Sequence, residues 1–119
     1  WFDVQLRQRG MLRPLRAAEL SDGTLRFLLW AAALMTRRPP SLMVLNEPET
    51  SLHPDLVRPL AGLITAAAAG TQIVVVTHSR ALLEFLGSGG EIELYKQWGE
   101  TRVEGQDLLN TPSWHWGKR

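Results

Sequence analysis

The chain opens with a stretch in which apolar and polar residues alternate. Phe2, Val4 and Leu6 are the apolar positions, and this period of two predicts a half-buried β-strand. Residues 7–19 lose the pattern and contain a glycine and a proline, so we interpret them as an irregular connection. This region therefore predicts one strand and no other regular element.

A dense run of helix-forming residues follows and predicts a helix over residues 24–36. Ser21 or Asp22 is expected to cap its start, because a side-chain oxygen there can accept the free amides of the first turn. Two arginines and two prolines at 37–40 end the helix. The residues expected to face the core, at helical spacing, are Leu25, Leu28, Leu29, Ala32 and Met35.

Two apolar runs and one amphipathic helix occupy the middle of the chain. Residues 42–45 and 72–76 are short, largely apolar runs, the second rich in β-branched residues, and each predicts a buried strand. Between them, residues 54–69 predict a helix that starts at a proline and ends before a glycine. Its apolar face is expected to consist of Leu56, Leu60, Leu63, Ile64 and Ala67. This order predicts a βαβ unit with parallel strands, and hence an α/β fold.

The last third of the chain predicts smaller elements. Ser79 is expected to cap a short helix that runs through Leu86. Residues 91–94 and 101–103 predict a final pair of strands around Gly99.

Composition is that of a folded protein and excludes several kinds of site. With 119 residues, 45% hydrophobic positions and a formal net charge of +1, the chain suits one domain with a core and is not strongly basic. The lack of cysteine excludes disulfides, thiolate metal sites and cysteine nucleophiles. The longest apolar run, residues 27–35, is far shorter than the roughly 20 residues that span a bilayer. We therefore expect a cytoplasmic protein that does not bind membranes.

Two polar side chains follow the two central strands at the same offset. Glu47 stands two residues past Leu45, and His78 stands two residues past Val76. Ligands of parallel sheets bind beyond the carboxyl ends of the strands, and neighbouring strands lie about 4.8 Å apart. A glutamate or a histidine after a strand is often only a solvated loop residue. The convergence of both at one rim favours a functional site.

Four segments, in order, resemble the characteristic segments of ABC-type ATPases. Residues 20–24 (Leu-Ser-Asp-Gly-Thr) resemble the signature sequence, and residues 42–47 resemble a Walker B strand followed by the catalytic glutamate. Residues 50–54 look like the D-loop and residues 75–79 like the H-loop. The wording Glu-Pro-Glu and Leu-His-Pro is more similar to the AAA-labelled ATPases related to the RecF, SMC and overcoming-lysogenization-defect groups than to membrane transporters. The resemblance implies a P-loop NTPase-like three-layer fold with parallel central strands, of which residues 1–119 are the C-terminal portion of an ABC-type ATPase head.

The resemblance also implies a role for each matched residue in binding and hydrolysing ATP. Glu47 would polarise the water that attacks the γ-phosphate, and His78 would hydrogen-bond that phosphate. Asn46 would hold Mg²⁺ through a bound water. In the homodimer that such ATPases form, the signature loop completes the ATP site of the opposite subunit and the D-loop lies along the seam. The residues that would line the nucleotide in this way are Ser21, Asp22, Gly23, Thr24, Ser51 and His53.

The sequence departs from the family pattern at several positions. Asn46 lacks the charge of the usual aspartate, and Asp22 and Thr24 replace a glycine and a glutamine of the signature. Gly23 is retained, and its lack of a Cβ is expected to let the backbone approach a phosphate closely. The phosphate-binding loop GxxxxGK[ST] appears nowhere in the 119 residues. The resemblance therefore implies the C-terminal half of an ATPase domain whose Walker A half is absent, and a fragment that is inactive alone.

Three classes of function remain open. The first is a soluble ATPase that drives a DNA-maintenance or defence process, and the second is the nucleotide-binding subunit of a transporter. The third is a non-catalytic ATP-sensing or interaction module, which the uncharged Asn46 keeps open. DNA and a partner protein are both candidate ligands of two further segments. These segments are the arginines Arg7, Arg9, Arg13 and Arg16, and the aromatic residues Trp98, Trp114 and Trp116.

Overall fold

The computed structural model describes residues 4–87 and 90–105. The chain divides into two units, residues 1–87 and residues 88–119, and each is described by itself. The first unit contains β1 (Gln5–Leu6), β2 (Leu15–Arg16), the short 3₁₀ helix η1 (Ala17–Glu19), α1 (Asp22–Leu34), β3 (Leu42–Asn46), α2 (Pro54–Ala68), β4 (Gln72–Val76) and α3 (Arg80–Leu86). The second contains β5 (Leu94–Gln97) and β6 (Glu100–Val103).

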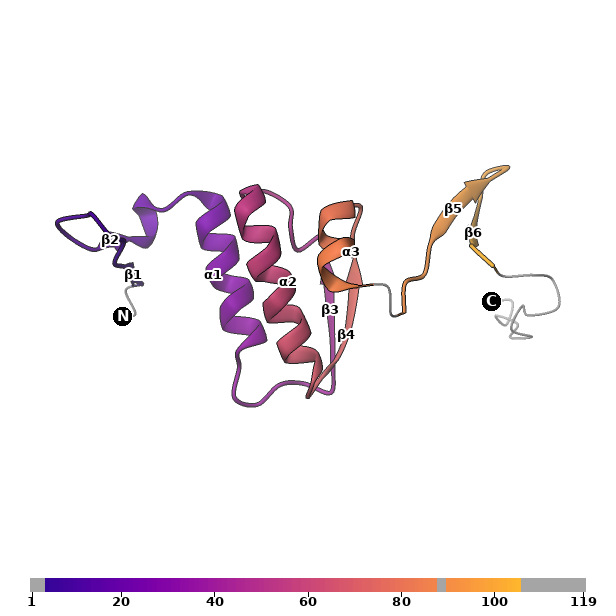
Figure 1. Ribbon diagram of the computed structural model, residues 1–119, viewed down its shortest axis with the longest axis horizontal. Coiled ribbons are helices and arrows are strands. Elements are labelled where there is room, and N and C mark those ends of the chain that lie inside the picture. Colours follow the sequence, from indigo (N-terminus) through magenta and orange to yellow (C-terminus); the bar gives the residue numbers. More distant parts are fainter. Residues whose placement is uncertain (1–3, 88–89, 106–119) are drawn as a thin grey trace, which may run out of the picture. The chain divides into compact units, whose positions relative to one another are not determined.

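The centre of the first unit is the predicted βαβ unit. Strands β3 and β4 pair in parallel, from Leu42 opposite Gln72 to Asn46 opposite Val76. Helix α2 connects them and stands between α1 and the two strands, and α3 also packs against α2 (Figure 1). The structure therefore confirms the α/β fold, the parallel strands and the crossover helix.

The core of this unit is built around α2. Four buried residues, Val57, Leu60, Ala61 and Ile64, come from this one helix. The other buried apolar residues are Leu34 of α1, Leu45 of β3 and Leu82 of α3. The predicted apolar face of α2 is largely confirmed, since Leu63 and Ala67 also pack against this cluster. Because α2 contacts helices on one side and strands on the other, its buried surface is wider than one stripe.

The two faces of the β3–β4 pair differ in what covers them. Met43, Leu45, Ile73 and Val75 lie on the face that packs against the core. The alternate residues on the opposite face, Leu42, Val44, Val74 and Val76, are between 43% and 60% exposed. Continuous apolar runs of this kind are typical of strands that are buried on both faces. Within residues 4–87 of the first unit, only one face is covered.

Helix α1 is confirmed, two residues earlier than predicted at each end, and its predicted core-facing side is wrong in part: Leu25 and Leu28 are half-buried, but Ala32 is exposed. Leu29 and Met35 are 71% and 70% exposed, whereas Phe27, Trp30 and Leu34 contact the core. The reason lies in the composition of the helix. Every position from Phe27 to Leu34 is apolar, so the spacing of apolar residues there does not distinguish one face from another.

The connection at residues 7–19 contains two elements that the sequence pattern does not reveal. Strand β2 pairs antiparallel with β1, with Gln5 opposite Arg16 and Leu6 opposite Leu15, and η1 follows directly. Each strand is only two residues long, too short for a period of two to be recognised. Phe2, the first apolar position of the predicted strand, lies outside the described residues.

The second unit contains a hairpin. Strand β5 pairs antiparallel with β6 from Leu94 opposite Val103 to Gln97 opposite Glu100. Trp98 and Gly99 connect them with φ values of 53° and 86°, and two positive φ values are typical of a type I′ turn. The predicted pair of strands around Gly99 is confirmed, although its first strand lies at 94–97 rather than 91–94. The tail with Trp114 and Trp116 lies outside the described residues.

Among residues 4–87 and 90–105, no helix combines the length and the hydropathy that crossing a membrane requires.

Candidate functional site

The two central strands end at the same rim, and the chain leaves that rim through Glu47 and Thr77. Asn46 and Val76 are the last paired residues, and the Glu47 amide donates a hydrogen bond to the Val76 carbonyl at 2.7 Å. Glu47 has a φ of 44°, a left-handed conformation that few residues other than glycine adopt. The sheet hydrogen bonding thus continues to Glu47, where the backbone turns sharply.

Glu47 and His78 lie close to each other at this rim, as their equal offset from the strand ends predicts. His78 Nε2 is 3.8 Å from Glu47 Oε1. The His78 side chain is 90% exposed and that of Glu47 is 45% exposed. An exposed pair at this distance contributes little to stability. Both groups are therefore open to a ligand at the carboxyl end of the sheet, where ligands of parallel sheets bind.

The turn after Glu47 is held by its own hydrogen bonds. The Thr50 amide donates to the Glu47 carbonyl at 3.1 Å, and the Thr50 hydroxyl donates to Glu47 Oε2 at 3.3 Å. The Thr50 carbonyl accepts a hydrogen bond from Arg26 of α1 at 2.9 Å. Thr50 therefore links the Glu47 carboxylate to the first helix. The sequence pattern gives no signal for this link, because Thr50 and Arg26 are far apart in the chain.

The predicted signature residues lie at the start of α1. Ser21 caps the helix, because its hydroxyl accepts a hydrogen bond from the Thr24 amide at 3.2 Å. Its Oγ also lies 2.9 Å from the Thr24 hydroxyl. Asp22 is the first helical residue and is exposed. Of the two predicted caps, Ser21 is the one that the structure confirms.

Gly23 packs against the segment 50–54 of its own chain, which is predicted to be the D-loop. A Cβ built on Gly23 would lie 2.5 Å from the carbonyl oxygen of Ser51, closer than real Cβ contacts. Ser51 itself has a positive φ of 66°. The lack of a side chain at Gly23 is therefore explained by contact with Ser51, a cause that the sequence analysis does not anticipate. The start of α1 and the segment 50–54 are therefore tightly packed against each other.

His53 occupies the cap of α2. Its Nδ1 accepts a hydrogen bond from the Asp55 amide at 3.3 Å, and Pro54 takes the first helical position. The His53 side chain is 71% exposed, and Ser51 is also exposed. The cap explains how His53 is held in place. It leaves most of the imidazole open to solvent, whereas the Ser51 hydroxyl accepts a hydrogen bond from Arg26 at 3.5 Å.

The donors at the rim suit a magnesium ion that is bound through few protein atoms. Asn46 is exposed at the end of β3, and the Glu47 carboxylate follows it directly. Within the described ranges, no cluster of three or more histidine, cysteine, aspartate or glutamate side chains could hold a metal. Mg²⁺ prefers oxygen donors and usually keeps several waters, with substrate phosphates as further ligands. The residues therefore fit such an ion and do not form an all-protein cage.

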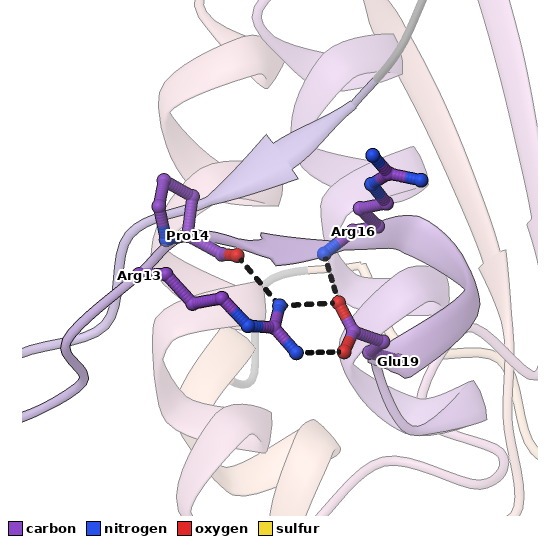
Figure 2. Close-up of polar contacts among 4 residues, drawn as sticks. All are labelled: Arg13, Pro14, Arg16 and Glu19. Atoms are coloured by element: carbon purple, nitrogen blue, oxygen red, sulfur yellow. Dashed lines mark hydrogen bonds and ion pairs between the residues drawn. The ribbon is translucent and has the colours of Figure 1, made fainter.

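The most strongly paired carboxylate lies elsewhere, beside the β1–β2 hairpin. Arg13 donates to both carboxylate oxygens of Glu19, at 2.6 and 2.9 Å, and the Arg16 amide donates to Oε2 at 2.9 Å (Figure 2). The hydrogen bonds from Arg13 and then from Arg16 lower the pKa of Glu19 from 4.5 to about 2. One of the four arginines in the basic segment is thus neutralised within the chain. This reduces the positive charge that the segment offers to DNA.

Comparisons with known proteins agree with this α/β fold. The family model described as "AAA domain, putative AbiEii toxin, Type IV TA system" matches residues 3–84. A solved structure from "Structural biochemistry of ATP-driven dimerization and DNA stimulated activation of SMC ATPases" contains a similar chain, with a TM-score of 0.73 and 17% sequence identity. The alignment covers 91% of this chain and 66% of that chain. No curated protein matches. At this identity the structural likeness shows the fold alone, which is the P-loop NTPase fold of SMC ATPases.

Proposed function

The chain belongs to the family of AAA domains that matches residues 3–84, and from this premise we propose that it forms part of an ATP-hydrolysing site. The observation that carries the proposal is the pair Glu47 and His78. They lie at one rim, 3.8 Å apart and open to solvent, where parallel sheets bind ligands. Three further observations support it. The chain has the fold of SMC ATPases, its four family-like segments occur in the expected order, and Asn46 and Glu47 offer oxygen donors for Mg²⁺.

In the proposed reaction, Glu47 acts as the general base. Its carboxylate orients a water molecule and accepts a proton as the water oxygen bonds to the γ-phosphorus, while the bond from that phosphorus to the leaving ADP oxygen breaks. His78 donates a hydrogen bond to a γ-phosphate oxygen. Thr50 supports this arrangement, because its hydroxyl holds Glu47 Oε2 at 3.3 Å and leaves Oε1 on the side of His78.

A bound Mg²⁺ would neutralise part of the negative charge of the ATP phosphates. In this proposal the Asn46 amide oxygen holds it through a water molecule, next to the Glu47 carboxylate. A neutral amide attracts the ion less strongly than an aspartate would. Asn46 is therefore the observation that favours a second candidate function, an ATP-sensing module that binds nucleotide without turning it over.

The proposed dimer would place the start of α1 against the nucleotide of the opposite subunit. A helix N-terminus with free amides carries a partial positive charge that suits a phosphate. Ser51 and His53 would lie along the seam. In this arrangement the contact between Gly23 and the Ser51 carbonyl would transmit movement of the seam directly to the signature helix.

We propose that the phosphate-binding loop comes from a segment outside these 119 residues. The sequence contains no GxxxxGK[ST], and the chain spans 66% of the SMC ATPase chain that it resembles. The apolar face that carries Leu42, Val44, Val74 and Val76 supports this proposal, because residues 4–87 of the first unit leave it exposed. Residues 1–119 would then be the C-terminal half of the ATPase domain, inactive alone. The process that ATP drives would be DNA maintenance or defence in the cytoplasm.

Phosphate release from ATP by the full-length protein tests this function. The wild-type protein should release phosphate only with Mg²⁺ present, and Glu47→Gln should stop release while ATP still binds. Glu84→Gln is the matched control, because Glu84 is an exposed glutamate on α3. ATP binding without phosphate release by the wild-type protein would instead establish the sensing module.

A further inference from the structure

A second carboxylate at the rim, Glu49, has no part in the reaction proposed above. Its Oε1 accepts a hydrogen bond from the Thr77 hydroxyl, which comes from the loop after β4. Its Oε2 is buried and has no hydrogen-bond partner among the described residues. Pro48, the residue before it, is fully buried. Glu49 is thus fixed beneath the rim, in the turn that also carries Glu47.

Thr77 also binds Ser79, the residue that follows His78 in the chain. The Thr77 oxygen accepts a hydrogen bond from the Ser79 amide at 2.9 Å, while its proton is donated to Glu49. The residues on both sides of His78 are therefore held, although the His78 side chain itself is 90% exposed. Fixing the backbone at both neighbours limits the directions in which the imidazole can point.

Stability alone does not account for a glutamate at this position. A buried carboxylate oxygen without a hydrogen-bond partner is unfavourable, and a hydroxyl or amide oxygen could accept the Thr77 hydrogen bond without leaving a second oxygen unpaired. The position of Glu49 is therefore best explained by what it holds in place, which is the Thr77 hydroxyl.

We propose that Glu49 is a positioning residue, which acts through Thr77 to present His78 to the γ-phosphate of ATP. This inference rests on the proposed function and adds a residue to it. The turn at 47–50 then positions both groups of the rim, Glu47 through the backbone and His78 through the hydrogen bond that the Thr77 hydroxyl donates to Glu49. His78 would contact only the γ-phosphate, so the loss of Glu49 should affect ATP and spare ADP.

The test uses the full-length protein with Glu49→Ala and Thr77→Val. Thr77→Val removes the hydroxyl and keeps the shape of the side chain. Thr77→Ser is the matched control, because it retains the hydroxyl. Each of the two disruptive variants should lower kcat by roughly 10-fold to 100-fold, because a small misplacement of a reacting group has effects of this size. Binding of a non-hydrolysable ATP analogue should weaken, whereas ADP binding should stay unchanged. Thr77→Ser should retain most of the wild-type activity.

A double-mutant cycle with His78→Ala separates positioning from a general structural role. If Glu49 acts through His78, Glu49→Ala should have little further effect on kcat in the His78→Ala protein. Equal effects in both backgrounds, or a parallel loss of ADP binding, would overturn the inference. If the wild-type protein hydrolyses ATP, Glu47→Gln stops it and the Glu49 variants match wild type, only the role of Glu49 fails. If the wild-type protein hydrolyses no ATP, the proposed function fails and this role fails with it.

Discussion

Two carboxylates in the first unit of the chain, Glu19 and Glu47, differ in how completely their oxygens are used. Both oxygens of Glu19 are bonded to Arg13, and Oε2 also accepts a hydrogen bond from the Arg16 amide. Glu47 has one hydroxyl at 3.3 Å and an imidazole at 3.8 Å. Glu19 joins η1 to Arg13 and Arg16 of the β1–β2 hairpin, whereas the Glu47 carboxylate can still accept hydrogen bonds from a ligand. The strongly lowered pKa of Glu19 has a structural cause, its hydrogen bonds to Arg13 and Arg16, and Glu19 lies outside the proposed reaction site.

The largest effect expected from this comparison is on hydrolysis. Glu47→Gln in the full-length protein should lower the rate of phosphate release by about 10²–10⁴-fold, the usual contribution of general base catalysis. Glu19→Gln removes a carboxylate of the same kind and should leave the rate nearly unchanged. Steady-state phosphate release measures both. A comparable loss of rate in the two variants would end the distinction between a structural and a reactive carboxylate.

The next effect concerns stability at the signature helix. Gly23→Ala should destabilise the protein by about 1–3 kcal/mol, because the new Cβ would overlap the Ser51 carbonyl and the packed backbone must shift. Thermal or denaturant unfolding of the full-length protein measures the change.

Gly62 in α2 supplies the control for Gly23. A Cβ there meets nothing within 4 Å, so Gly62→Ala should stabilise the helix by about 0.5–1 kcal/mol. Opposite signs for the two glycine variants are expected. A neutral Gly23→Ala would show that the signature helix and the D-loop are not tightly packed.

The smallest effect is the pH dependence that Glu19 contributes. Because the folded-state pKa of Glu19 is lowered from 4.5 to about 2, its stabilising contribution is present above pH 4.5 and is lost as the pH falls towards 2. Near neutral pH, Glu19→Gln should unfold at a slightly lower temperature than wild type, and this difference should shrink over that acid range. A difference that is constant with pH would contradict the assigned cause.

Much of the central fold follows from local pattern. The runs at 42–45 and 72–76 are predicted as strands because they are short, largely apolar and, in the second case, rich in β-branched residues, and the helix between them is predicted from its helical spacing. The same reasoning places Glu47 and His78 at one rim, since both follow parallel strands at equal offsets. In these cases local sequence alone decides the outcome.

Other features depend on contacts between distant segments and could not be predicted in this way. The face of α1 that packs against the core cannot be predicted, because every residue from Phe27 to Leu34 is apolar. The two-residue strands β1 and β2 carry no readable period. The approach of Gly23 to Ser51, and the hydrogen bond between Glu49 and Thr77, exist only once the chain has folded.

Single-turnover hydrolysis by the full-length protein tests the central claim, that the rim of Glu47 and His78 is the hydrolytic part of an ATP site. Radiolabelled ATP is bound in the presence of Mg²⁺, and the bound nucleotide is identified over time. The wild-type protein should convert it to ADP and phosphate, whereas Glu47→Gln should retain it as intact ATP. Conversion at equal rates by the two proteins would contradict the account.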